Sequence, residues 1–226
     1  MSITIYIWYL ISIEKINEFN IDILNKLDNL YNRSIKEGFM EKKKMGKKPN
    51  MFPFPVTIVG ANYKCKPNYM TIAFAGVVNM NPGMIALGVN AKHVTTRGIY
   101  ENKTFSINFP NEEMVKVTDY IGINSGKTVE KSKLFENFYG QLKNAPMIKE
   151  CPVNIECRVY KTIQDIGSDD IVIGEIIETY AGTDFITHGE IDIEKVKPIT
   201  FSWKGYYSTG NFIGKAWEIG KNYNKD

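Results

Sequence analysis

A cluster of basic and hydroxyl-bearing residues, at the start of an expected short helix, is the part of this sequence best suited to bind an anion. The cluster contains Lys92, His93, Thr95 and Thr96 and is followed by Arg97. The first N–H groups of a helix have no partner within the helix, and nearby hydroxyls and positive charges add charge-assisted hydrogen bonds. The cluster therefore predicts a phosphate site. A capped helix with incidental surface charge is the alternative for the same residues.

The elements that must position this cluster are mainly strands. Apolar, β-branched runs separated by Gly, Pro and Asn turns predict strands at residues 56–61, 69–79, 84–90, 104–109, 153–163, 170–181, 199–207 and 212–219. Helices are expected at residues 96–102, at 111–120 with Asn111 as the cap, and from the end of the 122–128 loop to about residue 138. Strands and helices do not alternate. The order therefore predicts a mainly β protein, a β-barrel with added helices, rather than a doubly wound parallel sheet.

Several spaced motifs resemble the flavin reductase-like, FMN-binding split-barrel family, and within it the flavoredoxin branch. They are the run from Met51 to Ala61, the turn and strand from Lys66 to Phe74, the Asn79-x-Asn81-Pro82 turn, and the run from Asn90 to Thr96. The similarity extends from about residue 42 to residue 221. The resemblance implies an FMN-binding split β-barrel that acts as a flavin-dependent oxidoreductase. It also implies a homodimer with FMN near the interface between the subunits.

The resemblance further implies which residues approach the cofactor. A protein that uses FMN must hold its phosphate and direct N–H donors at the nitrogen and oxygen atoms of its ring. In the family, the strand after the Lys-Pro-Asn turn supplies these donors, and the matching residues here are Asn68, Thr71, Ile72, Ala73 and Phe74. Relatives often carry Trp at the position of Phe74, so this chain keeps the aromatic ring but not the indole N–H. For Ile72 and Ala73, core packing is the alternative.

Two later segments also match motifs of the family. Residues 125–131 are similar to its Ser-Gly-x-x-x-Asp-Lys pattern, with Glu in place of Asp. The resemblance implies that Lys127 or Lys131 reaches the phosphate or the ring edge, from a loop or from a neighbouring subunit. A solvated helix start is the alternative. Residues 214–217 are similar to the closing motif of the family, and we expect Trp217 in core or dimer packing rather than at the flavin.

The composition is that of a soluble globular protein, with 43% apolar and 23% charged residues in a chain of 226. The 28 Lys and Arg residues exceed the 25 Asp and Glu residues by only three, so the net charge does not favour nucleic acid as a partner. We interpret the basic run at residues 42–48 as a solvated arm. An oligonucleotide-binding barrel, with Tyr206 and Tyr207 near Lys204 as its surface, is a minor alternative.

The three cysteines and two histidines limit the chemistry further. An odd number of cysteines without a convincing secretion signal predicts a reducing compartment and a cytoplasmic location. Strand alternation puts Cys157 on an apolar face, as a buried structural thiol. His93 and His188 are far apart in the sequence, so no metal site is expected. The sequence also contains no familiar catalytic triad or nucleophile elbow, and the catalytic side chains stay unassigned.

Residues 1–39 are expected to form an extension that precedes a flavin reductase-like domain of residues 40–226. The apolar run at residues 3–13 is too short to cross a bilayer and lacks the features of a secretion signal, so no membrane association is expected. Residues 21–35 have the apolar spacing of an amphipathic helix. Either this helix docks on the domain, or Met40 or Met45 is the true start of translation.

These observations predict an FMN-binding flavoprotein oxidoreductase. The reaction is either NAD(P)H-dependent reduction of flavin or flavoredoxin-like electron transfer through bound FMN. The expected electron donor is NADH, NADPH or a redox protein. The alternative is a non-enzymatic protein that binds or stores FMN, because the chemistry of a flavin belongs to the cofactor rather than to the side chains around it.

Overall fold

The computed structural model of the chain describes residues 22–23, 25–29, 40–221 and 223. These residues belong to two units, 1–50 and 51–226. In the first unit, residues 22–23 and 25–29 are helical and exposed, and residues 40–50 are exposed and irregular. Most of the helix predicted at residues 21–35 lies outside the described residues, as does the apolar run at residues 3–13. Among the described residues, no helix combines the length and the apolar character that crossing a bilayer requires.

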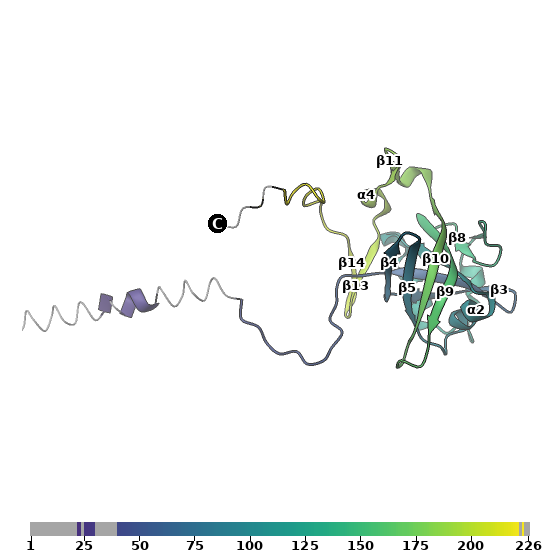
Figure 1. Cartoon of the computed structure of the whole chain (residues 1–226), viewed down its shortest axis with the longest axis horizontal. Helices are drawn as coiled ribbons and strands as arrows, with labels where there is room; N and C mark the ends of the chain where they lie inside the picture. Colours follow the sequence, from purple (N-terminus) through teal and green to yellow (C-terminus); the bar gives the residue numbers. More distant parts are fainter. Residues whose placement is uncertain (1–21, 24, 30–39, 222, 224–226) are drawn as a thin grey trace, which may run out of the picture. The chain divides into compact units, whose positions relative to one another are not determined.

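The second unit is built on a seven-stranded antiparallel sheet with the strand order β3-β2-β6-β9-β10-β5-β4 (Figure 1). The strands are β2 (Thr57–Tyr63), β3 (Lys66–Ile72), β4 (Ala75–Met80), β5 (Gly83–Val89), β6 (Thr104–Phe109), β9 (Val153–Ile163) and β10 (Asp170–Ala181). The two edge strands, β3 and β4, are consecutive in sequence and are joined by Ala73 and Phe74 alone. A connection of two residues keeps the two edges close together, so the sheet must curl into a barrel that is open between β3 and β4.

Three smaller sheets extend this barrel. One contains β1 (Phe54–Pro55), β13 (Ile199–Ser202) and β14 (Gly205–Ser208). The others pair β7 (Asn137–Phe138) with β8 (Met147–Ile148), and β11 (Ile186–Thr187) with β12 (Glu190–Ile191). The helices are α2 (Val94–Asn102), α3 (Val115–Ile123) and α4 (Ile193–Val196), with 3₁₀ turns η1 (Glu112–Met114), η2 (Lys131–Leu134) and η3 (Thr183–Phe185).

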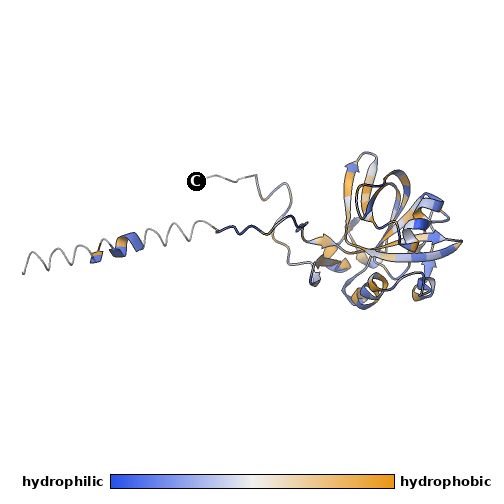
Figure 2. Cartoon of the chain, turned by 90° about the horizontal axis from the view of Figure 1, so that it is seen from below, coloured by the Kyte–Doolittle hydropathy of each residue, from blue (hydrophilic) through white to orange (hydrophobic). Residues whose placement is uncertain are grey.

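Strand β2 separates two hydrophobic clusters because successive side chains of a strand point to opposite faces. Val59 belongs to the larger cluster, together with Leu87, Phe105 and other buried residues of the barrel strands. Ile58 belongs to a smaller cluster that includes Tyr69 and residues of α3, β8 and the segments near them. Figure 2 shows that the apolar residues lie mainly along the strands and helices of this unit. Both faces of β2 are therefore covered, which holds α3 and its neighbours against the barrel.

The buried cysteines follow this division. Cys157 is fully buried in the larger cluster, as the strand alternation predicted, and Cys151 lies in the smaller one. Burial raises the pKa of both thiols, so both are protonated at neutral pH. These two cysteines are packing residues rather than reactive ones. Cys65 is exposed, and all three cysteines are free.

The barrel fold, the strands at 104–109, 153–163 and 170–181, and the helix near residue 96 are confirmed. The predicted strand at 69–79 is wrong, because the chain leaves the sheet at residues 73–74 to pass from one edge to the other. The predicted helix before residue 138 is also wrong, since only the turn η2 forms there and β7 follows. Asn111 caps the turn η1, accepting a hydrogen bond from the Met114 N–H at 3.2 Å, and α3 begins only at Val115.

The predicted strand at residues 212–219 is wrong as well. Residues 209–221 contain turns but no strand, and Phe212, Ile213, Trp217 and Ile219 are each at least 70% exposed. Trp217 is therefore not part of the core of this chain. The apolar pattern of the segment is real, but no strand of the described part of the chain pairs with it.

Gly174 in β10 tests the packing of the barrel interior. A Cβ atom at this position would overlap the ring of Phe105, which is fully buried. We expect Gly174→Ala to lower the free energy of unfolding by about 1–3 kcal/mol, as overpacked cores do, and the melting temperature by several degrees. The control is Gly76→Ala in β4, where a Cβ atom would meet nothing within 4 Å. Equal melting temperatures for the two variants, measured by circular dichroism, would contradict this account of the core.

Candidate functional site

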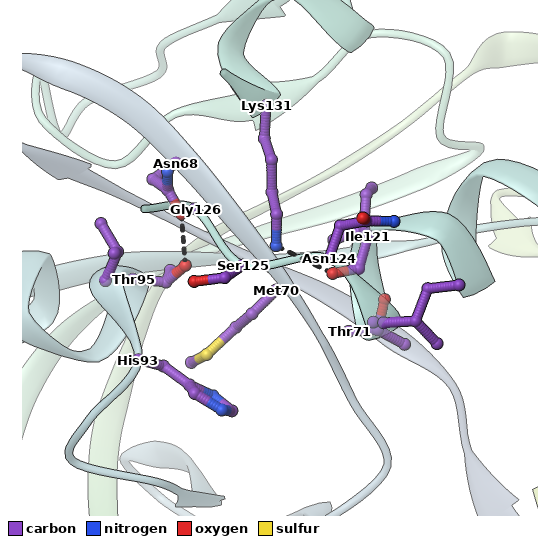
Figure 3. A pocket seen from close by; sticks show the side chains of 13 residues that line it. Asn68, Met70, Thr71, His93, Thr95, Ile121, Asn124, Ser125, Gly126 and Lys131 are labelled. Atoms are coloured by element: carbon purple, nitrogen blue, oxygen red, sulfur yellow. Dashed lines mark hydrogen bonds between the residues drawn. The ribbon is translucent and has the colours of Figure 1, made fainter. Parts of the chain in front are cut away.

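A cavity of about 170 Å³ lies between β3, the start of α2, the end of α3 and the loop that follows α3 (Figure 3). Strand β3 contributes Asn68, Met70 and Thr71. Helix α2 contributes its first turn, and α3 contributes its last residues, Ile121 to Ile123. The polar side chains that line the cavity belong to Asn68, Thr71, His93, Thr95, Asn124, Ser125 and Lys131. No Asp or Glu of the described chain lines it. Its polar groups therefore favour a negatively charged or neutral polar ligand.

The most unusual residue of the cavity is Lys131, whose side chain is only 3% exposed. Its Nζ donates hydrogen bonds to the backbone oxygens of Tyr69, at 3.0 Å, and Ile121, at 2.8 Å. Figure 3 shows the side chain extending into the cavity towards Asn124 and Ser125. An ammonium group has three N–H donors, so one remains for a ligand. Among the described residues Lys131 forms no salt bridge, and burial lowers its pKa to about 8.

The first turn of α2 forms the opposite wall. His93 is the N-cap residue and makes no side-chain capping bond, and the first turn holds no acidic residue. Burial lowers the pKa of His93, and the positive charge of Lys131 lowers it further, against an opposing effect of Asp169. The imidazole is therefore neutral at pH 7. The free N–H groups and partial positive charge of the helix start face the same cavity as Lys131.

Asn68 connects the two walls. Its side-chain oxygen accepts a hydrogen bond from the Thr95 hydroxyl at 2.9 Å, and both residues are buried. A Cβ atom at Gly126 would lie 2.7 Å from both the oxygen and the nitrogen of the Asn68 amide. Only glycine leaves this amide in place, because the contact is closer than a Cβ atom tolerates. This contact gives a steric reason for the Ser-Gly motif at residues 125–126.

Five of the predicted site residues come together in this cavity: Asn68, Thr71, His93, Thr95 and Lys131. The hydroxyl of Thr71 already donates to the Thr118 backbone oxygen at 2.6 Å. Lys127 does not line the cavity but lies in a basic groove beside it. The two parts of the sequence that predicted an anion site, around residues 93 and 131, are therefore neighbours in the fold.

The other predicted site residues lie elsewhere. Lys92 is exposed, and its backbone N–H donates to the Asn90 side chain at 3.0 Å. Thr96 is fully buried, with its hydroxyl 3.8 Å from the sulfur of Met70. Ile72 packs in the larger cluster, and its carbonyl accepts a hydrogen bond from the Thr57 hydroxyl at 3.0 Å. The side chain of Ile72 therefore packs in the core, which was the alternative to a role at the cofactor.

Phe74 and Ala73 form the link between the barrel edges. The ring centroid of Phe74, which is 44% exposed, lies 5.6 Å from that of Phe54 and 6.3 Å from that of Trp203. Ala73 is half-buried. Sequence reasoning missed Trp203 as a neighbour of Phe74, because the two are more than a hundred residues apart.

Sequence reasoning also missed Met70, Ile121 and Asn124 as lining residues. The Asn124 side chain donates to the Tyr120 backbone oxygen at 2.8 Å and closes the end of α3. The sequence indicated these residues only weakly. The end of a helix and the loop with Gly126 were recognisable, but the contact of this loop with β3 was not. Within the described chain, no group of three or more His, Cys, Asp or Glu is arranged to hold a metal ion.

The fold and the sequence together define the class of this protein. The sequence profile of the "Flavin reductase like domain" matches residues 49–208, most of the chain. The chain therefore belongs to the flavin reductase-like family. Flavoredoxin from Methanosarcina acetivorans is 44% identical in sequence, with a TM-score of 0.78 over 80% of this chain and 98% of that one.

Two further structures extend the comparison. Flavoredoxin of Desulfovibrio vulgaris (Miyazaki F) is 32% identical, with a TM-score of 0.75 over 80% of this chain and all of that one. The flavin reductase HpaC, in a complex with NADP+, is 24% identical, with a TM-score of 0.57 over 71% of this chain and 92% of that one. The likeness to HpaC shows the fold alone. The flavin reductase-like split barrel with flavoredoxin relatives, predicted from the sequence, is confirmed.

The lowered pKa of Lys131 predicts a pH-dependent stability. The unfolded chain holds the Lys131 proton up to about pH 10, and the folded chain loses it near pH 8. Between these values the unfolded state binds more protons, so the contribution of Lys131 to the free energy of unfolding rises with pH. We expect the difference in this free energy, wild type minus Lys131→Met, to rise by about 1 kcal/mol per pH unit in this range.

Urea unfolding of both proteins at pH 7.5, 8.5 and 9.5 measures this difference. Subtracting the variant removes the contributions of the buried cysteines and tyrosines, which titrate equally in both proteins. A difference that stays constant over this range would mean that Lys131 is not held in the buried, desolvated position described above.

Proposed function

We propose that this chain is an FMN-binding flavoprotein that holds one end of the cofactor in the cavity and passes electrons through it. The observation that carries the proposal is Lys131, a buried cation with a free N–H donor, which faces a cavity free of carboxylates beside the start of α2. A buried cation without a counter-ion is costly, and an anionic ligand offsets that cost. Membership of the flavin reductase-like family and the flavoredoxin relatives support the same ligand.

The residues of the cavity fit the polar parts of FMN. The Lys131 ammonium and the free N–H groups of the first turn of α2 suit the phosphate or the polar edge of the ring. The cavity volume of about 170 Å³ is smaller than the ~300–1,000 Å³ of pockets that enclose whole ligands of this size. FMN would therefore be only partly enclosed by one chain. Partial enclosure leaves room for an electron donor or acceptor, which a storage protein does not need.

When bound, FMN would supply the redox chemistry. The residues of the chain have supporting tasks: Lys131 neutralises negative charge, and the hydrogen bond between Thr95 and Asn68 fixes the wall that the ligand contacts. His93 is neutral at pH 7 and offers a donor or an acceptor without adding charge. We infer a flavin-dependent oxidoreductase of the flavoredoxin or flavin reductase type. Storage of FMN is the alternative, and binding of oligonucleotides has less support, because the Tyr206 hydroxyl is bonded to Asp119 at 2.9 Å.

The visible absorption spectrum of the purified protein tests the proposal directly. We expect a flavin band after incubation with FMN and desalting. Under anaerobic conditions, NADH, NADPH or a reduced iron–sulfur protein should bleach this band within seconds. Reduction by dithionite alone would replace the oxidoreductase proposal with storage, and the absence of a flavin band at every FMN concentration would refute FMN binding.

Two neighbouring threonines provide a matched pair of variants. Thr95→Val removes the hydroxyl that holds Asn68 at the cavity wall, whereas Thr96→Val removes a hydroxyl that contacts only the Met70 sulfur. We expect Thr95→Val to weaken FMN binding about tenfold, because a buried acceptor then loses its partner. Thr96→Val should change FMN affinity by less than about twofold. Fluorescence titration with FMN measures both affinities, and the reverse order of effects would move the phosphate site to Thr96.

We also propose that the protein is a homodimer. Strand β4 is an edge of the sheet, and Val77, Val78 and Met80 on it are 64%, 55% and 85% exposed. Phe212, Ile213 and Trp217 near the end of the chain add further exposed apolar surface. An exposed, apolar edge strand is prone to aggregation unless it is covered, and a second copy of the chain would cover it.

A charge on β4 tests the dimer. Val77→Asp would bury a carboxylate in an interface formed by β4, so it should convert the dimer to a monomer at micromolar concentration. The control is Ile166→Asp, at a similarly exposed apolar residue of the loop between β9 and β10. Light scattering coupled to size-exclusion chromatography reports both masses. A wild-type monomer would exclude the dimer, and dimers of Val77→Asp would exclude β4 as its interface.

A further inference from the structure

Asn137, which lies outside the cavity, contacts the residues that hold both ends of the Lys131 side chain. Lys131 begins η2, and the next residue, Ser132, accepts a hydrogen bond through its backbone oxygen from the Asn137 side-chain nitrogen at 3.4 Å. The Asn137 side-chain oxygen accepts a hydrogen bond from the Tyr69 hydroxyl. The backbone oxygen of Tyr69 in turn accepts one from the Lys131 Nζ at 3.0 Å. One amide therefore links the backbone next to Lys131 with the strand residue that binds its ammonium group.

Tyr69 is the centre of this arrangement. Its side chain is fully buried, and its ring packs edge to face against that of Phe135, which follows η2 directly, with 5.6 Å between the ring centroids. Burial raises the pKa of the Tyr69 phenol, so its hydroxyl stays protonated and donates to Asn137. A buried hydroxyl without a partner is costly. Removing the Asn137 amide would therefore disturb the residue that binds Lys131.

Asn137 is itself held in place by the barrel. It pairs with Ile148 in the two-stranded sheet of β7 and β8. The Ile148 N–H donates to the Asn108 side chain of β6 at 3.0 Å, and the Asn154 side chain of β9 donates to the Ile148 backbone oxygen at 2.8 Å. Both of these asparagines are buried. Asn137 therefore has a fixed position relative to β6 and β9.

We propose that Asn137 is a positioning residue for Lys131, which keeps the ammonium group at the cavity wall for the anionic part of the ligand. A lysine side chain is long and flexible and loses conformational entropy when it is fixed in one position. Holding the backbone at Ser132 and the acceptor at Tyr69 limits the positions that the Nζ can reach. This role rests on the proposed function only for the identity of the ligand.

The protonation of Lys131 reports its position without any ligand. Burial lowers its pKa to about 8, so an ammonium group that moves towards water should have a higher pKa. Strand β3 and helix α3 face this group with backbone carbonyls, which do not titrate. His93 of α2 is neutral at pH 7, and Glu130 and Lys133, close by in the chain, are exposed and bonded to each other at 2.9 Å. A change in the Lys131 pKa therefore reflects its burial.

Two substitutions of asparagine by alanine in residues 137–148 form a matched pair. Asn137→Ala removes the acceptor of the buried Tyr69 hydroxyl. Asn144→Ala removes the acceptor of the buried Thr104 hydroxyl, at 2.9 Å, and neither of these two residues lines the cavity. The Cε carbon-13 NMR signal of Lys131, assigned by its absence in Lys131→Met, measures the pKa in the full chain without FMN. We expect Asn137→Ala to raise this pKa by about one pH unit or more, and Asn144→Ala to leave it unchanged.

A third variant, Tyr69→Phe, removes the hydroxyl alone and leaves the bond between Asn137 and Ser132. It should raise the Lys131 pKa in the same direction by a smaller amount, and it keeps the role testable if Asn137→Ala does not fold. Fluorescence titration at pH 7 adds the ligand. FMN affinity should fall about tenfold in Asn137→Ala and by less than about twofold in Asn144→Ala, because only the first displaces a charged donor.

The outcomes separate positioning from a general loss of structure. An unchanged Lys131 pKa in both Asn137→Ala and Tyr69→Phe overturns the proposal. An equal rise in Asn144→Ala also overturns it, since this would show that residues 137–148 loosen as a whole. A raised pKa with the FMN affinity of the wild type would exclude a role in binding. If the wild type binds no FMN, a rise in Asn137→Ala alone would support the positioning of Lys131 and refute only the proposed function.

Discussion

The two-residue connection between β3 and β4 is the constraint on which the rest of the fold depends. These strands are the opposite edges of a seven-stranded sheet, yet only Ala73 and Phe74 separate them in the chain. So short a link forces the sheet to curl, and the curled sheet encloses Phe105, Leu87 and the other residues of the larger cluster. Because β3 and β4 do not pair with each other, the barrel stays open along this line. Phe74 lies in that opening, against Phe54 and Trp203.

The site follows from the way β3 is covered on its outer face. Its inward side chains, such as Ile72, fill the barrel, and its outward side chain Tyr69 packs with α3 and its neighbours. Lys131 reaches the seam between these layers, where its ammonium group is bonded to one carbonyl of β3 and one at the end of α3. These hydrogen bonds need strand and helix to be correctly packed. The charge of the site and the docking of α3 on the barrel are therefore coupled.

The positive charges around the site form two groups, one buried and one exposed. Lys131 and the start of α2 face a small cavity, and the basic groove adds exposed cations beside it. A buried cation interacts strongly with a ligand because little water screens it, whereas exposed cations act over longer distances and are weakened by salt.

The sequence by itself determined the elements with strong local patterns. Apolar, β-branched runs identified the strands at 104–109, 153–163 and 170–181, with alternation clear in the second, and hydroxyl and basic residues identified the start of α2. The family motifs predicted the barrel fold and indicated Asn68, Thr95 and Lys131 as candidate binding residues. Only the tertiary structure decided that the chain breaks at residues 73–74 and that residues 212–219 do not form a strand, because pairing partners distant in the sequence set both outcomes.

The burial of Lys131 was likewise decided by tertiary structure alone. In the sequence, the family motif at residues 125–131 indicated Lys127 or Lys131 and did not decide between them. Carbonyl groups of two other elements, β3 and α3, bury and bind its ammonium group. Local sequence patterns record which face of a strand or helix is apolar. They do not record which distant backbone atoms contact a side chain. For Lys131, these contacts decide how its ammonium group is buried and bonded.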